Sequence, residues 1–157
     1  MKTKKSWREK LADAKNLPRV ITLEGAARRR WGGTTLAIAA PVEIDALMKR
    51  VPRGRVTTIN ALRTAVARAH RADAACPITT GIFAWVAAHA AEESAAAGGK
   101  RITPWWRTLK TGGELNAKYP GRVSAQKKRL AAEGHRFTRR GAKVRVAGYE
   151  DLLFQYA

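Results

Sequence analysis

The basic side chains of this sequence are concentrated at its two ends, and the segment between them is nearly neutral and rich in alanine. Residues 1–33 carry ten basic and three acidic side chains, residues 34–97 carry seven and five, and residues 98–157 carry fourteen and four. A polyanion would therefore meet basic surface from both ends of the chain, around an apolar centre. The net charge of +19 exceeds what solubility requires, and it makes nucleic acid or an acidic substrate the first partner to consider.

The length and the cysteine content exclude several classes of protein. With 157 residues, the chain is long enough for one ordinary domain and too short for two. Cys76 is the single cysteine, which excludes an internal disulfide and a structural zinc site and fits a reducing compartment. The longest apolar stretch, Ile82 to Ala91, is about half of the roughly 20 residues that span a bilayer. We therefore expect no membrane association, no cofactor and no metal.

The start of the chain has no sign of export. Its first ten residues are basic but lack the apolar segment of a secretory signal. We therefore expect the protein to stay where it is made, in the cytoplasm and associated with the nucleoid. We also expect it to be a monomer.

Residues 1–45 are expected to form a short basic N-terminal α/β extension. Ser6 and Glu9 have the spacing of a capping box, which begins a helix, and Pro18 ends it. Two strand-like stretches follow, separated by basic residues and glycines. The expected elements are a helix over 6–16, a strand over 19–23, a basic turn over 28–33, a strand over 34–39, and a helix that starts at Pro41 and stops before the turn 51–54.

Residues 46–157 are expected to form a winged helix-turn-helix domain, so that the fold class is mainly α with small β hairpins. Two helices are joined by a short irregular segment that contains Cys76, which is the outline of a helix-turn-helix. The expected helices are one capped by Thr57 or Thr58 that runs to about His70, and one started by Thr79 or Thr80 that covers 81–96.

The last third of the chain supplies the expected wing. Residues 108–115 have the composition of a hairpin that turns at Gly112 and Gly113. A helix over 123–133 follows, and Gly134 suits its left-handed C-terminal residue. Strand-like residues then flank the turn 139–142, and a short helix over 149–154 closes the chain.

From Val51 onward, the order of these signals resembles the DNA-binding domain of the methylated-DNA-protein-cysteine methyltransferases. It resembles more closely their non-enzymatic relatives, the alkyltransferase-like proteins. The resemblance covers about 85 residues, and its matching pieces are Val51–Thr58, the helix Gly81–Ala90, Pro104-Trp105-Trp106-Arg107, the Gly112-Gly113 wing and Gln126–Gly134.

The resemblance implies a winged helix that presents its second helix to the DNA minor groove and flips an O-alkylated guanine into a pocket. In the enzymes, a Pro-Cys-His-Arg motif supplies the thiolate that accepts the alkyl group irreversibly. Here Trp105 replaces the cysteine and Trp106 the histidine, and an indole is not a nucleophile for this transfer. In the alkyltransferase-like proteins the cysteine alone is commonly replaced, often by tryptophan, and the lesion is bound without repair. Trp105 fits that pattern, whereas Trp106 departs from it further.

Two other positions differ from the family. The tyrosine that helps to rotate the target phosphate is Ile59, and the arginine that fills the gap left by the flipped base is Ile78. A shift of the alignment by one residue places Pro77 or Thr79 there instead. An apolar side chain still wedges between bases, but it lacks the charged contact to the orphaned base.

The candidate site residues carry both functional and structural interpretations. Trp105 and Trp106 either form the wall of a base pocket or fill the former active-site cavity, and Arg107 either holds its loop or meets a phosphate. These three are the candidates for a lesion pocket. The DNA-binding candidates are Thr57, Thr58, Ile59, Ile78, Thr79, Thr80, Gly81, Lys100, Arg101, Lys110, Lys127, Lys128 and Arg129.

Two other features invite a catalytic or metal-binding interpretation. Cys76 has no nearby pattern that would lower the pKa of its thiol, so we interpret it as a partly buried, inert cysteine. His89 and Glu93 stand four apart on a helix, but with no second such pair we interpret them as an ordinary surface pair.

The leading hypothesis is a non-catalytic DNA-binding protein that recognises alkylated or distorted double-stranded DNA and signals to a repair pathway. The first alternative is a general DNA- or RNA-binding module with a filled, purely structural former active site, in which Arg28, Arg29 and Arg30 help to grip a folded nucleic acid. The second alternative is an alkyltransferase that uses Cys76. An alanine-rich reading helix offers few groups to base edges, so we expect little sequence selectivity.

Overall fold

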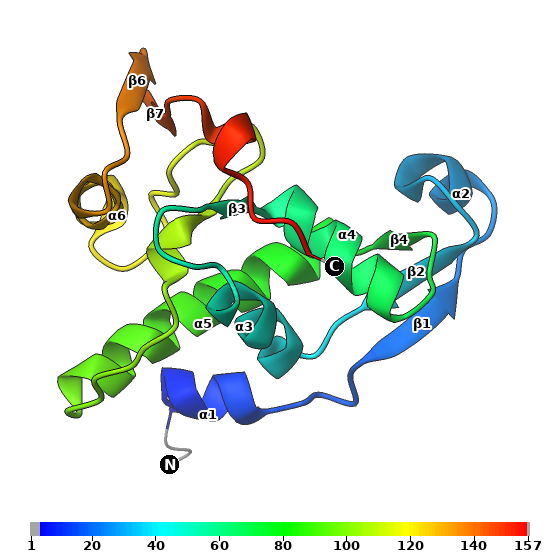
Figure 1. Cartoon of the computed structure of the whole chain (residues 1–157). Helices are drawn as coiled ribbons and strands as arrows, with labels where there is room; N and C mark the ends of the chain where they lie inside the picture. The colour runs from blue at the N-terminus through cyan, green and yellow to red at the C-terminus, as the bar shows by residue number, and fades with distance from the viewer. Residues whose placement is uncertain (1–3, 157) are drawn as a thin grey trace.

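The computed structural model describes residues 4–156 (Figure 1). Within these residues the helices are α1 (Trp7–Ala12), α2 (Ala26–Trp31), α3 (Pro41–Lys49), α4 (Ile59–Ala69), α5 (Pro77–Ala96) and α6 (Arg122–Ala132), with two 3₁₀ turns, η1 (Trp105–Arg107) and η2 (Tyr149–Leu152). The strands are β1 (Arg19–Thr22), β2 (Thr35–Ile38), β3 (Thr57–Thr58), β4 (Ala74–Ala75), β5 (Thr108–Leu109), β6 (Phe137–Arg140) and β7 (Lys143–Val146).

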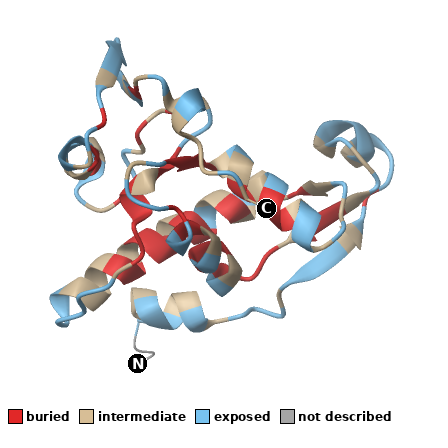
Figure 2. Cartoon of the chain, in the orientation of Figure 1, coloured by how far each residue is buried: buried red, intermediate tan, exposed pale blue. Residues whose placement is uncertain are grey.

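Helix α5 is the centre of the molecule. Helices α1, α3 and α4 and the turn η1 all contact it, and Figure 2 shows that buried residues continue along much of its length. The sequence placed its start at Thr79 or Thr80, but the helix begins at Pro77, whose missing N–H costs nothing in a first turn. The Thr80 hydroxyl instead donates to the Cys76 carbonyl oxygen at 2.7 Å.

The expected helix-turn-helix is formed by α4 and α5. The Thr58 hydroxyl accepts a hydrogen bond from the Ala61 N–H at 3.1 Å, so Thr58 is the cap of α4 among the two threonines that the sequence offered. Leu62 and Val66 of α4 are fully buried. Between the two helices the sequence predicted a loop, but Ala74 and Ala75 form the short strand β4.

The N-terminal residues are joined to this core by a sheet and by two helices. Strand β1 pairs antiparallel with β2, and β2 pairs in parallel with β4, so the sheet has the order β1-β2-β4. Helices α1 and α3 lie on α5, and the expected domain boundary between residues 45 and 46 falls inside α3. The predicted basic turn over 28–33 is in fact the helix α2, which ends at the left-handed Gly32. Helix α1 stops at Ala12, because Asp13 is extended.

The wing differs from the sequence prediction. Residues 108–115 make a tight turn, in which the Lys110 N–H donates to the Glu114 carbonyl at 2.8 Å, but its two arms are not paired strands. Strand β5 instead pairs in parallel with β3, and Glu114 bridges to Arg145 of β7. The hairpin of this region is β6–β7, which turns at Gly141. A glycine pair encodes a turn, but long-range pairing decides which strands flank it.

The core lies between α5, α3, α4 and the segment from η1 to α6. Its largest fully buried side chains include Trp105, Ile44, Met48, Leu62, Leu109 and Leu130. The C-terminal segment returns to this core, where Phe154 donates its N–H to the Val56 carbonyl at 2.8 Å. In residues 4–156, no helix has both the length and the hydropathy needed to cross a membrane.

The cap of α4 can be tested by substitution. We expect Thr58→Ala to lower the free energy of unfolding by about 1 kcal/mol, since it leaves an N–H of the first turn without its partner. Thr58→Ser loses the methyl group but keeps the hydroxyl, and it should stay close to wild type in the same urea titration. An alanine variant as stable as the serine variant would show that the cap contributes nothing.

Candidate nucleic-acid interface

Trp105 fills the position that the sequence resemblance assigns to a reactive cysteine. The side chain is 1% exposed, and its indole N–H donates to Glu92 Oε1 of α5 at 2.9 Å. Its ring meets those of Trp106 and Tyr119 edge to face, at centroid distances of 5.8 and 5.6 Å. No face of Trp105 is therefore open for a base to stack on.

Trp106 and Arg107 are tied to one carboxylate. Glu133, at the end of α6, accepts from Trp106 Nε1 at 3.1 Å and from Arg107 Nε and Nη2 at 2.9 and 2.7 Å. Arg107 Nη1 also donates to the Val51 carbonyl at 2.8 Å. Burial opposes ionisation of Glu133, but the hydrogen bonds from Arg107 and Trp106 outweigh it and hold the pKa of this carboxyl below its ordinary value. Arg107 thus holds its loop, which was one of the two roles expected for it.

A second carboxylate completes this network. The Arg129 guanidinium lies 4.3 Å from the Trp106 ring centroid, and Arg129 Nη2 donates to Glu92 Oε1 at 2.9 Å. Trp106 is 9% exposed and borders an open hollow of about 450 Å³, whose other lining residues are three basic side chains, Glu133 and two alanines. Sequence reasoning missed both Glu92 and Glu133. The sequence feature that could have pointed to them is the scarcity of acidic residues, since the whole chain has 12 acidic against 31 basic side chains.

Gln126 of α6 holds this region together from inside. Its side chain is fully buried, its amide Nε2 donates to the carbonyls of Trp106 and Thr108 at 3.2 Å each, and its Oε1 accepts from the Asn116 N–H at 2.8 Å. One side chain therefore links η1, β5 and the loop that contains Asn116 to α6.

The start of α5 borders an open groove that the two tryptophans of η1 do not line. A groove of about 690 Å³ is lined by Ile78, Gly81, Ile82, Trp85, Asn116 and Lys118. The side chains of Ile78 and Ile82 are 59% and 47% exposed, which is unusual for residues of this kind. A Cβ at Gly81 would meet no atom within 4 Å, so the groove beside this residue is open. Sequence reasoning included Ile78 and Gly81 but missed Ile82 and Trp85.

Three of the four threonines named as DNA-binding candidates are not accessible to a partner. Thr57, Thr58 and Thr80 are buried. The Thr58 and Thr80 hydroxyls serve the helices that they precede or belong to. Thr79 is partly exposed beside Ile78, and Ile59 is partly buried at the start of α4.

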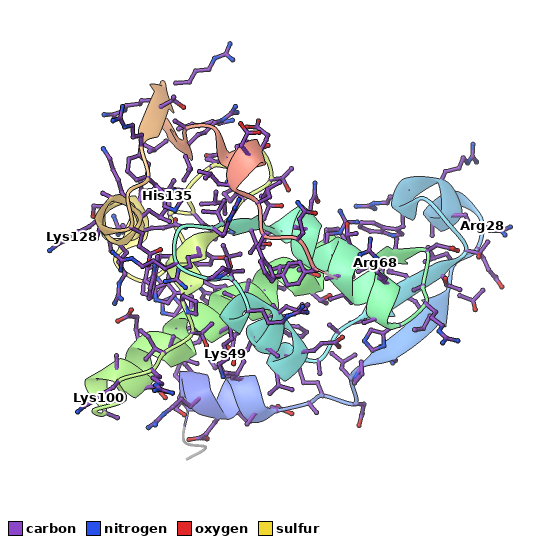
Figure 3. The ribbon with its side chains drawn as sticks, viewed as in Figure 1. Arg28, Lys49, Arg68, Lys100, Lys128 and His135 are labelled. Carbon is purple, nitrogen blue, oxygen red and sulfur yellow. The ribbon has the colours of Figure 1, made fainter. Side chains whose placement is uncertain are left out.

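The basic candidates divide into separate regions. Lys127 and Lys128 are exposed on α6, and Lys110 is exposed on the turn after β5. Lys100 and Arg101 follow the far end of α5, about 30 Å from its start because each of its 20 residues adds about 1.5 Å. Figure 3 shows Lys128 and Lys100 on the same side of the molecule and Arg28 on the opposite side. Lys100 and Arg101 are thus separated from the start of α5 by the length of that helix.

Cys76 and the pair His89 and Glu93 have ordinary surroundings. Cys76 is the partly buried N-terminal cap residue of α5. The His89 ring stacks on Trp7 at 4.4 Å, and Glu93 accepts hydrogen bonds from the backbone N–H groups of Trp7 and Arg8 at 3.0 and 3.2 Å. Both side chains thus fasten α1 to α5.

The Glu133 network makes a prediction about stability and pH. Glu133→Gln removes the charge opposite a largely buried guanidinium, and we expect it to cost about 2–3 kcal/mol of unfolding free energy at pH 7. The pKa of Glu133 is lower in the folded state than its ordinary value of 4.5. The stabilisation from this carboxylate is therefore complete above that ordinary value and is lost as the pH falls through the lower one.

Urea unfolding measures this effect. The difference between wild type and Glu133→Gln should shrink as the pH is lowered from 7 to about 3. Glu150→Gln, at an exposed position, is the control and should match wild type throughout. A constant difference at all pH values would contradict the assignment.

Comparisons with known proteins bear on the fold. No protein-family model and no curated protein matches the sequence. The chain is similar to a crystal structure of S. pombe ATL in complex with DNA, with a TM-score of 0.53 and 16% identity, covering 74% of this chain and 94% of that one. A structure of S. pombe Atl1 in complex with damaged DNA containing O6-carboxymethylguanine has a TM-score of 0.48 and 17% identity, with the same coverage. The first of these likenesses confirms the fold that the order of motifs predicted: the chain has the fold of an alkyltransferase-like protein.

Proposed function

We propose that this chain is a non-catalytic DNA-binding protein that recognises alkylated or distorted double-stranded DNA. The observation that carries the proposal is the start of α5, where two exposed isoleucines border an open groove in a strongly basic chain. The solved relative with the same fold is a complex with DNA, which supports nucleic acid as the partner.

Ile78 and Ile82 are the groups that would enter the duplex. They stand four apart, so they project from the same side of α5. Exposed apolar side chains in the minor groove act as wedges between base steps, where they unstack and kink the DNA. A damaged or mispaired base costs the least to displace, which favours distorted sites over intact ones. The rest of α5 is mostly buried, so its other residues are not free to read a sequence.

The groove beside these residues is the place for a displaced base. Trp85 is partly exposed and lines the groove, and its ring also meets those of Trp7 and His89 edge to face. Stacking of a base on an aromatic side chain is worth roughly 1–3 kcal/mol. Lys118, on the opposite rim, is exposed and supplies a positive charge for the backbone of the displaced nucleotide. Because Trp105 and Trp106 are buried, this groove takes over the role first expected of those two residues.

The proposal excludes alkyl transfer by this chain. Trp105 stands at the position of the thiolate, and its indole is not a nucleophile for alkyl transfer. Cys76, the partly buried cap residue of α5, is near the groove in sequence but does not line it. Removal of a lesion would therefore depend on other proteins of a repair pathway.

A second candidate function is general nucleic-acid binding without damage recognition. The observation that favours it is the burial of Trp105 and Trp106, which occupy the position of the family's active site as part of the hydrophobic core. Under this alternative the basic surface binds phosphates, and the groove at Ile78 is not used by a base.

Fluorescence anisotropy with two duplexes separates the candidates. We expect tighter binding to a duplex with one O-alkylguanine than to its unmodified twin, and Ile78→Ala should weaken lesion binding about tenfold because it removes apolar contact surface. Val42→Ala removes an equally exposed apolar side chain from α3 and should have no effect. Equal affinity of the wild type for both duplexes would leave only the second candidate.

Intact-mass measurement tests the absence of transfer. After incubation with alkylated duplex, we expect the mass of the protein to be unchanged, since no thiol lies at the former catalytic position. Cys76→Ser should bind the lesion duplex as the wild type does. An added alkyl mass that disappears in Cys76→Ser would identify an enzyme.

A further inference from the structure

Residues 19–38 form a projection that we call the arginine arm. It consists of β1, α2 and β2, and α2 lies at the opposite edge of the molecule from α6 and the β6–β7 hairpin (Figure 1). Arg28, Arg29 and Arg30 are adjacent and exposed on α2, and Figure 3 shows Arg28 at this outer edge. No side chain of α2 is buried, so the arginines do not serve the core.

The three arginines have no acidic partner in the described part of the chain. No ion pair joins any of them to a carboxylate of residues 4–156. Glu24 is the only acidic residue of the arm. Arg30 lies 5.0 Å from the ring centroid of Trp31, a contact that leaves its charge unbalanced. Three adjacent like charges repel one another, and an external anion relieves that repulsion.

A specific contact fixes the arm to the body. Asp73 accepts from Thr34 N–H and Thr34 Oγ1 at 2.9 Å each and from Thr35 N–H at 3.2 Å. The Asp73 N–H donates in return to Thr35 Oγ1 at 2.9 Å. These hydrogen bonds, first of all those from Thr34, hold the pKa of Asp73 below its ordinary value. Gly33 packs so closely that an added Cβ would lie 2.4 Å from Asp73 Cβ.

The same sheet connects the arm to the start of α5. Strand β2 pairs with Ala74 and Ala75 of β4, and the Cys76 N–H donates to the Ala37 carbonyl at 3.0 Å. Cys76 is the cap residue from which α5 begins. The arm therefore holds a fixed position relative to Ile78, only a few residues further along the chain.

We propose that the arginine arm binds the phosphate backbone of duplex DNA beside the segment engaged by the start of α5, and so extends the contact along the duplex. The inference rests on the proposed DNA binding and adds a second point of attachment to it. A guanidinium pairs with phosphate oxygens through two parallel hydrogen bonds. Successive residues of a helix point about 100° apart, so those arginines that contact the duplex meet separate phosphates rather than one.

The test compares a long and a short duplex. On a duplex of about 30 base pairs, Arg28→Ala/Arg29→Ala/Arg30→Ala should flatten the log-log salt dependence of binding by up to about 2.7, which is about 0.9 for each lost phosphate contact. On a duplex of about 10 base pairs, too short for both attachments, the same variant should lose much less.

Two controls separate position from charge. Arg28→Lys/Arg29→Lys/Arg30→Lys keeps the charges and should keep most of the salt dependence. Lys4→Ala/Lys5→Ala/Lys10→Ala removes three charges at and before α1 and should leave the salt dependence on the long duplex unchanged.

Asp73→Ala gives an independent test. It raises the net charge by one, so a role for charge alone predicts tighter binding. Loss of the contacts to Thr34 and Thr35 frees the arm, so the proposal predicts weaker binding to the long duplex, by about threefold to tenfold. A thermal melt shows whether the variant remains folded, and Asp73→Asn, which keeps the acceptor oxygen, should fall between the two.

The outcomes are distinct. If the alanine variant of the arm keeps the wild-type salt dependence on the long duplex, the arm is not a DNA contact, while the proposed DNA binding stands. If the wild type binds neither duplex, both proposals fail. If the variant loses affinity only for a structured RNA, the partner is RNA and the proposal for duplex DNA is overturned.

Discussion

The architecture depends on how closely other elements approach α5. Ala84, Ala87 and Ala88 are fully buried, and side chains of this size let neighbouring helices lie at the short end of the usual 8–10 Å separation. Helices α1, α3 and α4 and the turn η1 therefore all reach the same helix. The first turns of α5 remain open on one side, at Ile78 and Ile82, and its last turn is exposed at Ala96. Although α5 is the second helix of the helix-turn-helix, most of its residues are buried or partly buried, so its exposed residues are the most accessible to a partner.

The elements that the sequence predicted well carry local signals. Thr58 as a cap, Pro41 at the start of α3 and Gly134 after α6 each reflect a preference that operates within a few residues. Strand β4 has no such signal, because its two alanines become a strand only through β2. The same limit applied to the candidate site: the residue types at 105–107 were clear, but the carboxylates that decide their exposure come from α5 and α6. A sequence pattern does not show which carboxylates, distant along the chain, will contact these residues in the fold.

The few acidic residues are placed so that the surface remains basic. Glu92 and Glu133 are engaged with the indoles and guanidinium groups around η1. Asp45 is buried, where it accepts from the Thr103 hydroxyl at 2.6 Å. Asp45 also pairs with the exposed Lys49 at 3.0 Å, and Glu92 pairs with Arg129 at 2.9 Å. These carboxylates therefore satisfy buried donors and neutralise part of the surface charge, while the chain keeps a net charge of +19.

The burial of Trp105 has a consequence for any attempt to install sulfur chemistry in this scaffold. A cysteine there would leave most of the volume of an indole empty, at a cost of about 3–5 kcal/mol, and would take the donor away from Glu92. The adjacent Trp106 would not act as a proton acceptor for the new thiol, since its ring nitrogen only donates. A reactive thiol at position 105 would therefore require coordinated changes in the ring pair and in the carboxylates that hold it.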